Sequence, residues 1–111
     1  MIAKKIPNSK SGSKARRVAG VANYIVDPER ENGLEKCVHH EAENFFTDTH
    51  EGHIAEMTAL AQDAVRSKDP IDHWVLSWRP EERPSIDQVR EAVHIFAEHC
   101  CLKGHQTIWG L

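Results

Sequence analysis

The sequence contains no long apolar run, and this absence excludes a membrane-spanning segment. Among its 111 residues, no stretch approaches the roughly 18 consecutive apolar residues that a transmembrane helix requires. A signal peptide is missing as well, because the polar first 17 residues lead into no apolar core. A chain of this length can bury about two thirds of its extended surface, which is enough for one hydrophobic core. We therefore expect one soluble, cytoplasmic domain.

Two further absences narrow the chemistry. Residues 9–14 (SKSGSK), which follow the first predicted strand, lack the spacing of a Walker motif, and this excludes a P-loop NTPase. The three cysteines are an odd number, and Cys100 and Cys101 are adjacent, so no disulfide framework is expected. We interpret all three as reduced thiols.

Acidic residues are missing from the N-terminal end, although the chain as a whole is acidic. Residues 1–17, here called the basic N-terminal block, contain six basic side chains and no acid. The remaining 94 residues contain eight basic and seventeen acidic ones, so +6 and −9 give the net charge of −3. A basic block on an acidic body indicates a local site for a polyanion, and a solvated arm is the alternative. The six basic residues are Lys4, Lys5, Lys10, Lys14, Arg16 and Arg17.

Capping residues and apolar spacing predict alternating strands and helices. Ser13 is a candidate N-cap for a first helix that Asp27 and Pro28 end, and Ser85 with Gln88 forms a capping box for the third. Gly104 stands where the residue after the end of that third helix is expected. The predicted strands are 2–6, 34 to about 43, 73–78 and 106–111, and the first two helices run from 13 to about 26 and from about 51 to 67.

This order predicts an α+β fold, with a sheet of about four to five mostly antiparallel strands backed by helices in the ferredoxin-like manner. A doubly wound parallel sheet fits less well because no glycine-rich phosphate loop follows the first strand. Apolar residues at helical spacing predict the positions that face the core. They are Val18, Val21, Ala22 and Ile25 in the first helix, Ile54, Met57, Ala61, Ala64 and Val65 in the second, and Ile86, Val89, Val93, Phe96 and Ala97 in the third.

Tyr24 is the only tyrosine. At helical spacing it lies at the edge of the apolar face, on a stripe with Gly20 and Arg17. A ring beside a residue without a side chain, one turn from a guanidinium, leaves room for a phosphate to approach the phenol. Such a phenol can accept a phosphoryl group and store the bond as a phosphotyrosine ester. A structural tyrosine with its hydroxyl in water is the alternative.

Ser77 lies in the predicted strand 73–78. Alternation along a strand places Trp74 and Trp78 on one face and Ser77 on the other. If the helices pack on the tryptophan side, Ser77 faces outward and can donate to a phosphate, whereas the opposite packing makes it a core hydroxyl. No G-x-S-x-G elbow surrounds it, which argues against a serine hydrolase. The tryptophans, Trp109 included, are either core residues or stacking platforms for unpaired bases.

Eight histidines are many for this length, so metal binding has to be considered. His39 and His40 would point to opposite faces of a strand, and His50 and His53 are three residues apart at a helix start. None of the histidines shows the spacing typical of a zinc site. This also holds for the cluster near the end of the third helix, which contains His99, Cys100, Cys101 and His105. We therefore expect surface histidines and assign no metal ligand.

Four segments together resemble a known family. They are MIAKKIP at the start, a helix ending in VANYIVD, the HWVLSW strand followed by EERPS, and the closing GHQTIWGL. Their order and spacing resemble the N-terminal part of a relaxase, as in the TraI/MobA-like mobilization nucleases (HUH nucleases) of conjugative and mobilizable plasmids and integrative elements. The resemblance covers essentially the whole chain. It implies that residues 1–111 are the N-terminal portion of a relaxase nuclease domain.

The resemblance implies roles for two residues. Tyr24 matches the family's nucleophile, which attacks a phosphodiester at the origin of transfer and stays linked to the DNA 5′ end. Ser77 matches the second motif, whose serine helps to hold DNA near the cleavage site. In such proteins a third motif, His-x-Asp-x-x-Asn-x-His-x-His, supplies three metal-binding histidines, and it would start immediately after Leu111. Mg²⁺ or Mn²⁺ is therefore expected for the full-length protein, and the 111 residues alone are expected to nick DNA very weakly or not at all.

The resemblance also implies partners. Single-stranded or origin-of-transfer DNA would lie along Lys4, Lys5, Lys14, Arg16 and Arg17. Accessory relaxosome proteins and a type IV coupling protein would join the parent protein in a bacterial cytoplasm. A homodimer through the unfinished last strand is a further expectation, because exposed strand edges pair readily.

Two other function classes stay open at this point. A noncatalytic nucleic-acid-binding module with about four phosphate contacts would lose affinity steeply with salt, with a log–log slope near −3 for single strands. A zinc-binding interaction domain is the other alternative, and stoichiometric zinc in the purified protein would support it.

Overall fold

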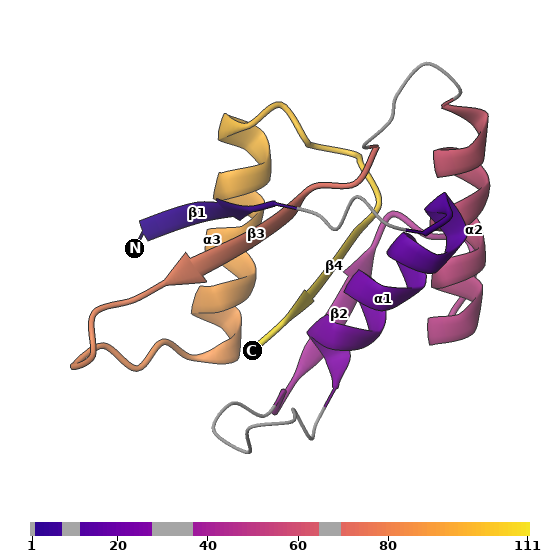
Figure 1. Cartoon of the computed structure of the whole chain (residues 1–111). Helices are drawn as coiled ribbons and strands as arrows, with labels where there is room; N and C mark the ends of the chain where they lie inside the picture. The colour runs from indigo at the N-terminus through magenta and orange to yellow at the C-terminus, as the bar shows by residue number, and fades with distance from the viewer. Residues whose placement is uncertain (1, 8–11, 28–36, 65–69) are drawn as a thin grey trace.

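The computed structural model describes residues 2–7, 12–27, 37–64 and 70–111. Strands and helices alternate along the described chain, as Figure 1 shows. The strands are β1 (Ile2–Ile6), β2 (His40–Glu43), β3 (His73–Ser77) and β4 (Thr107–Gly110). The helices are α1 (Lys14–Val26), α2 (His50–Asp63) and α3 (Ile86–His99).

The four strands form two antiparallel pairs. β1 pairs with β3, so that Ile2 lies opposite Ser77 and Ile6 opposite His73. β2 pairs with β4, with Glu41 opposite Trp109, and the bond from Val38 N to Leu111 O continues this ladder beyond the strands. The α+β class and the antiparallel pairing are confirmed, but the described strands form two separate two-stranded sheets and not the single sheet of four to five strands that was predicted.

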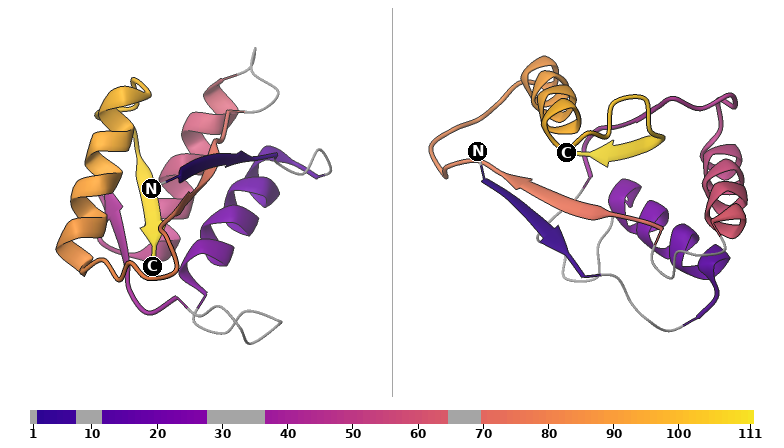
Figure 2. Two further views of the ribbon diagram at one scale, coloured as in Figure 1. Left: turned by 90° about the vertical axis from the view of Figure 1, so that its left-hand side faces the viewer. Right: turned by 90° about the horizontal axis from the view of Figure 1, so that it is seen from above.

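The helices cover both faces of the β2–β4 pair. Figures 1 and 2 show α3 on one side, and α1 with α2 on the other. Alternation along β4 explains this arrangement, because Trp109 joins Val89 and Val93 of α3 in a buried cluster while Gly110 faces α1. A Cβ atom at Gly110 would lie 2.5 Å from the carbonyl oxygen of Ile25, so only glycine allows α1 to approach this closely.

The core consists of two parts on either side of that pair. Leu76, Trp78 and Leu111 pack against the cluster of Val89, Val93 and Trp109. The other buried residues, Val18, Ala22 and Ala61, lie on α1 and α2, which pack against each other. Five of the predicted core-facing residues are thus buried. Ile86, the first residue of α3, is 40% exposed, so its predicted place in the core is wrong.

The predicted helix starts are confirmed by their hydrogen bonds. Arg16 N donates to Ser13 Oγ at 3.2 Å, and Gln88 N donates to Ser85 Oγ at 3.2 Å. Ser85 N donates in return to Gln88 Oε1 at 2.8 Å, which completes the capping box. Local sequence was sufficient here because each cap involves residues only three positions apart.

The predicted role of Gly104 is wrong. α3 ends at His99, and Cys101 takes the left-handed conformation after the helix with a φ of 58°. Leu102 N bonds to Ala97 O at 2.7 Å and Cys101 N to Glu98 O at 3.3 Å, the two bonds of a Schellman motif. Gly104, with a φ of 86°, belongs to the turn that follows.

The other predicted boundaries agree in part. α2 ends at Asp63, earlier than predicted, and Val65 and residues 66–67 lie outside the described residues. β2 contains only the end of the predicted strand 34–43, and residues 34–36 are also outside the description. In the part of the chain that is described, no helix is long and apolar enough to cross a membrane.

Candidate active site

Tyr24 lies in the last turn of α1, and half of its surface is exposed. Val18 and Ala22 anchor the opposite side of the helix in the core, and this leaves the phenol at the margin. Its ring meets the ring of His73 edge-on, with centroids 6.0 Å apart and planes at 70°. Tyr24 is therefore presented at the surface, beside the first residue of β3.

One face of the β1–β3 pair includes His73 and so lies next to Tyr24. Residues directly opposite each other in an antiparallel pair share a face, as do residues two apart along a strand. We call this face the outer face of the β1–β3 pair. It contains Ile2, Lys4, Ile6, His73, Val75 and Ser77.

Ser77 is exposed on this outer face, as predicted for helices packed on the tryptophan side. Trp78 and Leu76 contact the core below α3, and the rings of Trp74 and Phe96 are 5.0 Å apart. With Trp109 buried, the tryptophans act as core residues and not as exposed stacking platforms.

Tyr24 and Ser77 lie near opposite ends of β3. Ser77 is four positions after His73, which at the rise of a strand is roughly 13 Å. The two predicted site residues therefore share a side of the molecule without touching. A ligand that contacts both must therefore span the length of β3.

The three described lysines that were predicted to bind DNA have different environments. Lys4 is exposed on the outer face, opposite Val75. Lys5 points to the other face of β1, where its ammonium group lies 3.2 Å from Asp72. Lys14 donates to the carbonyl oxygen of Ala64 at 2.8 Å and so ties α1 to α2. Structural contacts thus occupy two of the three, and Lys4 is the one that faces the Tyr24 side.

The predicted stripe on α1 lies at the surface. Arg16 is exposed, Arg17 is half-buried, and a Cβ atom at Gly20 would meet nothing within 4 Å. The turn before Tyr24 is therefore open. Lys10, the remaining member of the basic N-terminal block, lies outside the described residues.

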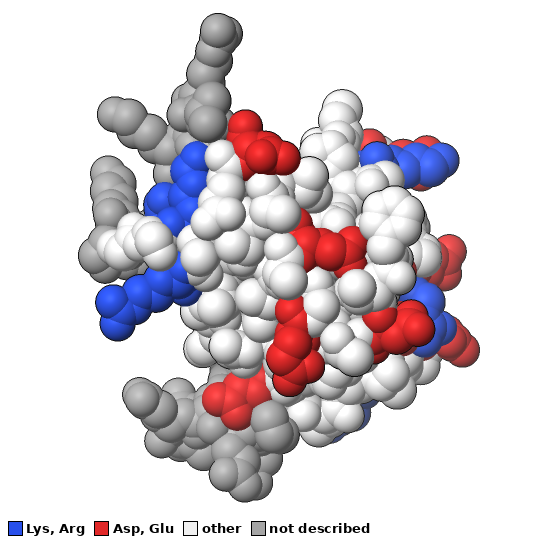
Figure 3. All heavy atoms as spheres, turned by 90° about the vertical axis from the view of Figure 1, so that its right-hand side faces the viewer, with Lys and Arg blue, Asp and Glu red and all other residues white. Residues whose placement is uncertain are grey.

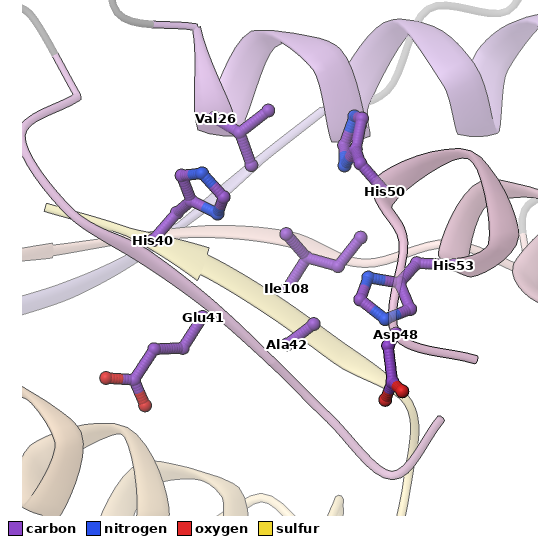
Figure 4. A pocket seen from close by; sticks show the side chains of 8 residues that line it. All are labelled: Val26, His40, Glu41, Ala42, Asp48, His50, His53 and Ile108. Carbon is purple, nitrogen blue, oxygen red and sulfur yellow. The ribbon is translucent and has the colours of Figure 1, made fainter. Parts of the chain in front are cut away.

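A cleft of about 210 Å³ lies between the end of α1, the β2–β4 pair and the start of α2 (Figure 4). His50 and His53 line it from the start of α2, where the sequence placed them; their position at a cleft was not predicted. Their Nε2 atoms already have partners, because His50 bonds Asn23 Oδ1 at 2.8 Å and His53 bonds Thr47 O at 2.9 Å. The other lining residues are Val26, His40, Glu41, Ala42, Asp48 and Ile108.

The described residues do not fit a catalytic metal. No group of three or more histidine, cysteine, aspartate or glutamate side chains among them converges in a way that could hold one. His39 and His40 point to opposite faces of β2, as predicted. The ring of His39 bonds Glu41 at 2.7 Å, and His40 lines the cleft.

A charged contact between α3 and β2 stabilises this framework. Arg90 Nε donates to Glu41 Oε1 at 2.8 Å, Nη2 donates to Oε2, and Nη1 donates to Asp87 at 2.6 Å. The Arg90 guanidinium and then His39 lower the pKa of Glu41 to about 2, and the two carboxylates raise the pKa of Arg90. Next to it, His94 Nε2 lies 2.5 Å from Glu43 Oε1.

Sequence reasoning did not find these pairs, nor the contact between Tyr24 and His73. The sequence did contain a signal for the pairs of Arg90 with Glu41 and His94 with Glu43. Glu41 and Glu43 are two apart on a strand and so share a face, and Arg90 and His94 are four apart on a helix and so share a face as well. Which strand face that helix covers is decided by tertiary packing.

Comparison with known proteins decides the family. A family model described as the nuclease domain of MobA/VirD2-like relaxases matches residues 24–111. The chain belongs to the relaxase family. The match begins at Tyr24 and includes β3 with Ser77, so the resemblance drawn from the sequence is confirmed.

One curated relative of the relaxase chain is Protein MobA of Acidithiobacillus ferrooxidans. It is 60% identical over 55 residues, which cover 50% of this chain and 13% of that protein. The matched part thus spans about an eighth of the relative's length. No solved structure matches the chain.

Proposed function

We propose that this chain carries the nucleophile of a relaxase that nicks one DNA strand at an origin of transfer. In the proposed step, Tyr24 Oη forms a bond to the phosphorus of the scissile phosphodiester. The bond from phosphorus to the 3′ oxygen breaks, the phenol proton is transferred to that oxygen, and the DNA 5′ end remains on Tyr24 as a phosphotyrosine ester. The observation that carries this proposal is an exposed, unique tyrosine beside an open helical turn, in a chain of the relaxase family.

The outer face of the β1–β3 pair is the proposed path of the DNA. Lys4 lies midway between the Tyr24 end and the Ser77 end and can neutralise a phosphate, while the Ser77 hydroxyl can donate to another. Arg16 and Arg17 would extend the path along α1, with smaller roles for Lys5 and Lys14 because both have structural partners. The expected ligand is single-stranded or origin-of-transfer DNA.

The family's metal dependence enters as part of this proposal. A bound Mg²⁺ or Mn²⁺ would polarise the phosphate and neutralise charge on the departing oxygen. The described residues do not form its site, so no step here runs through it. We propose that these 111 residues alone nick DNA very weakly or not at all. Relaxosome proteins and a coupling protein remain proposed partners of the parent protein.

A nicking assay tests the proposal. A longer relaxase that contains these 111 residues is mixed with Mg²⁺ or Mn²⁺ and with supercoiled plasmid bearing the cognate origin. It should relax the plasmid and form a covalent protein–DNA adduct on a denaturing gel. Tyr24→Phe keeps the ring and removes the nucleophile, so it should lower the rate by about 10⁴-fold or more without changing DNA affinity.

Two outcomes would contradict the proposal. An adduct that persists in Tyr24→Phe would show that another residue is the nucleophile. Efficient relaxation by the 111-residue chain, blocked by the same substitution, would overturn only the claim of inactivity. Ser77→Ala is the matched comparison, and it should weaken binding and leave the adduct at Tyr24.

A noncatalytic nucleic-acid-binding module is the second candidate, and the exposed Lys4 and Arg16 favour it. Binding of single-stranded DNA that falls steeply with salt, without any adduct in the longer protein, would support this candidate instead.

A further inference from the structure

The segment that joins β2 to α2 presents a fully exposed aromatic side chain. Phe46 is 98% exposed, more than any other large apolar residue among those described. Its neighbour Phe45 points the other way, and its ring stacks on His53 with centroids 4.3 Å apart. We call residues 44–49 the Phe46 tip. A side chain of this kind costs solvation free energy unless something covers it.

Hydrogen bonds fix the backbone of the Phe46 tip. The carboxylate of Glu56 accepts from Phe46 N at 3.0 Å, from Thr47 N at 3.0 Å and from Thr47 Oγ1 at 2.5 Å. The bonds from Thr47 and Phe46 lower the pKa of Glu56, because they stabilise its charged form. Asn44, with a φ of 68°, donates to the carbonyl oxygen of His105 at 2.8 Å.

The start of α2 packs directly below the tip. A Cβ atom at Gly52 would lie 2.6 Å from Thr47 Oγ1, so the helix approaches the tip as closely as glycine allows. The backbone of the tip is thus fixed before Phe46 meets a partner. A preorganised aromatic anchor loses little conformational entropy on binding and is typical of residues that dominate interfaces.

The surroundings of the Phe46 tip are acidic. Residues 37–64 contain no lysine or arginine. Figure 3 shows acidic side chains gathered on the face over α2. Nucleic acid is repelled from such a surface, whereas a basic protein surface is attracted to it. The acids of this segment are Glu41, Glu43, Asp48, Glu51, Glu56 and Asp63.

The chain contains a surface with the complementary properties. On the outer face of the β1–β3 pair, Ile2 is 73% exposed and Val75 is 42% exposed, and Lys4 lies between them. Figure 2 shows this pair on the side of the molecule opposite the connection between β2 and α2. One molecule therefore presents, on one side, apolar side chains around the single lysine Lys4, here called the basic patch, and an acidic aromatic tip on the other side.

We propose that two copies of this chain associate head to tail. Phe46 of one copy packs on Ile2 and Val75 of the next, and Asp48 and Glu51 beside it approach Lys4. The contact is heterologous, because each copy uses two different surfaces, and it extends into short chains or closes into a ring. It is independent of the proposed function, and it differs from pairing through a strand edge because side chains make it.

Sedimentation velocity of the 111-residue chain tests this association. The contact is small, so self-association should develop between about 10 µM and about 1 mM and weaken in high salt. Phe46→Ser and Lys4→Glu should each abolish it, while circular dichroism confirms that both variants are folded. Leu60→Ser, which removes a 57% exposed leucine from α2, is the matched control and should associate like the wild type.

Mixing the two defective variants gives the decisive result. Phe46→Ser keeps an intact basic patch and Lys4→Glu keeps an intact tip, so together they should form a one-to-one pair and no longer assembly. A chain that stays monomeric at every concentration overturns the proposal. Association that survives Phe46→Ser overturns it as well, because pairing through a strand edge does not need this side chain. Failure of the two variants to pair with each other also overturns it, because a symmetric contact of two tips behaves in this way.

A further experiment rests on the proposed function. If DNA uses the outer face, a single-stranded oligonucleotide should dissociate the assemblies. Assemblies that persist with DNA bound would contradict the proposed DNA path and leave the self-association unaffected.

Discussion

The outer face of the β1–β3 pair and the segment from Cys37 to Ala64 have opposite character. The first carries Lys4 among apolar side chains, whereas the second is acidic and hydrogen-bonded through Glu41 and Glu56. The difference shows that a net charge of −3 describes neither region. Polyanions and basic proteins would approach this chain from different sides.

Disrupting the close approach of α1 to β4 should have the largest effect on stability, because backbone atoms must shift. Gly110→Ala places a methyl group 2.5 Å from Ile25 O, between the helix of Tyr24 and the strand paired with β2. We expect a loss of about 1–3 kcal/mol of unfolding free energy, measured by urea denaturation. Gly20→Ala, where the methyl group meets open space, should instead stabilise α1 by about 0.5–1 kcal/mol. Equal effects of the two would contradict the close approach.

Substitution of single lysines should distinguish a role in DNA binding from a role in stability. Lys4→Ala should reduce the log–log salt slope of single-stranded DNA binding by about 0.7, because one phosphate contact is lost. Lys14→Ala should lower stability and leave the slope nearly unchanged, because Lys14 bonds Ala64. Fluorescence anisotropy over a salt series measures both. The reverse ranking of the slopes would place the DNA along α1 instead of β1.

Acid should destabilise the segment from Cys37 to Ala64, because Glu41 becomes protonated. Its pKa is about 2 in the folded chain, below the ordinary value of 4.5, so the ion pair with Arg90 stabilises the fold fully above about pH 4.5. That contribution is lost progressively as the pH falls through 4.5 toward 2. Glu41→Gln should flatten this part of the curve of stability against pH. A curve of unchanged shape would show that Glu41 is not the group responsible.

The smallest expected effect lies outside both regions. Cys101→Gly supplies the residue that a left-handed conformation prefers and should stabilise the fold by less than about 1 kcal/mol. Thermal unfolding measures it. DNA binding and self-association should not change, so any change in either would show that the end of α3 is coupled to one of the two surfaces.

Sequence reasoning succeeded where the determinants are local. The caps at Ser13 and Ser85 depend on residues three apart, and the alternation that places Ser77 on the face opposite Trp74 and Trp78 depends on one strand. Which of these two faces the helices cover stayed open until the packing against α3 was known. It failed at Gly104, because two cysteines and a leucine close α3 before the glycine is reached. The partners of Lys14 and Glu41 are 50 and 49 residues away in sequence, and no local pattern indicates which distant groups a fold will bring to them.

The position of Tyr24 has a practical consequence. Because it is the only tyrosine and is half exposed, every tyrosine signal of this chain comes from one ring at the proposed reaction centre. Its ring-proton resonances, or its iodination by a surface reagent, would report on that one position without any label. With His73 at its edge and the outer face beyond, the ring is a built-in probe for whatever occupies that face.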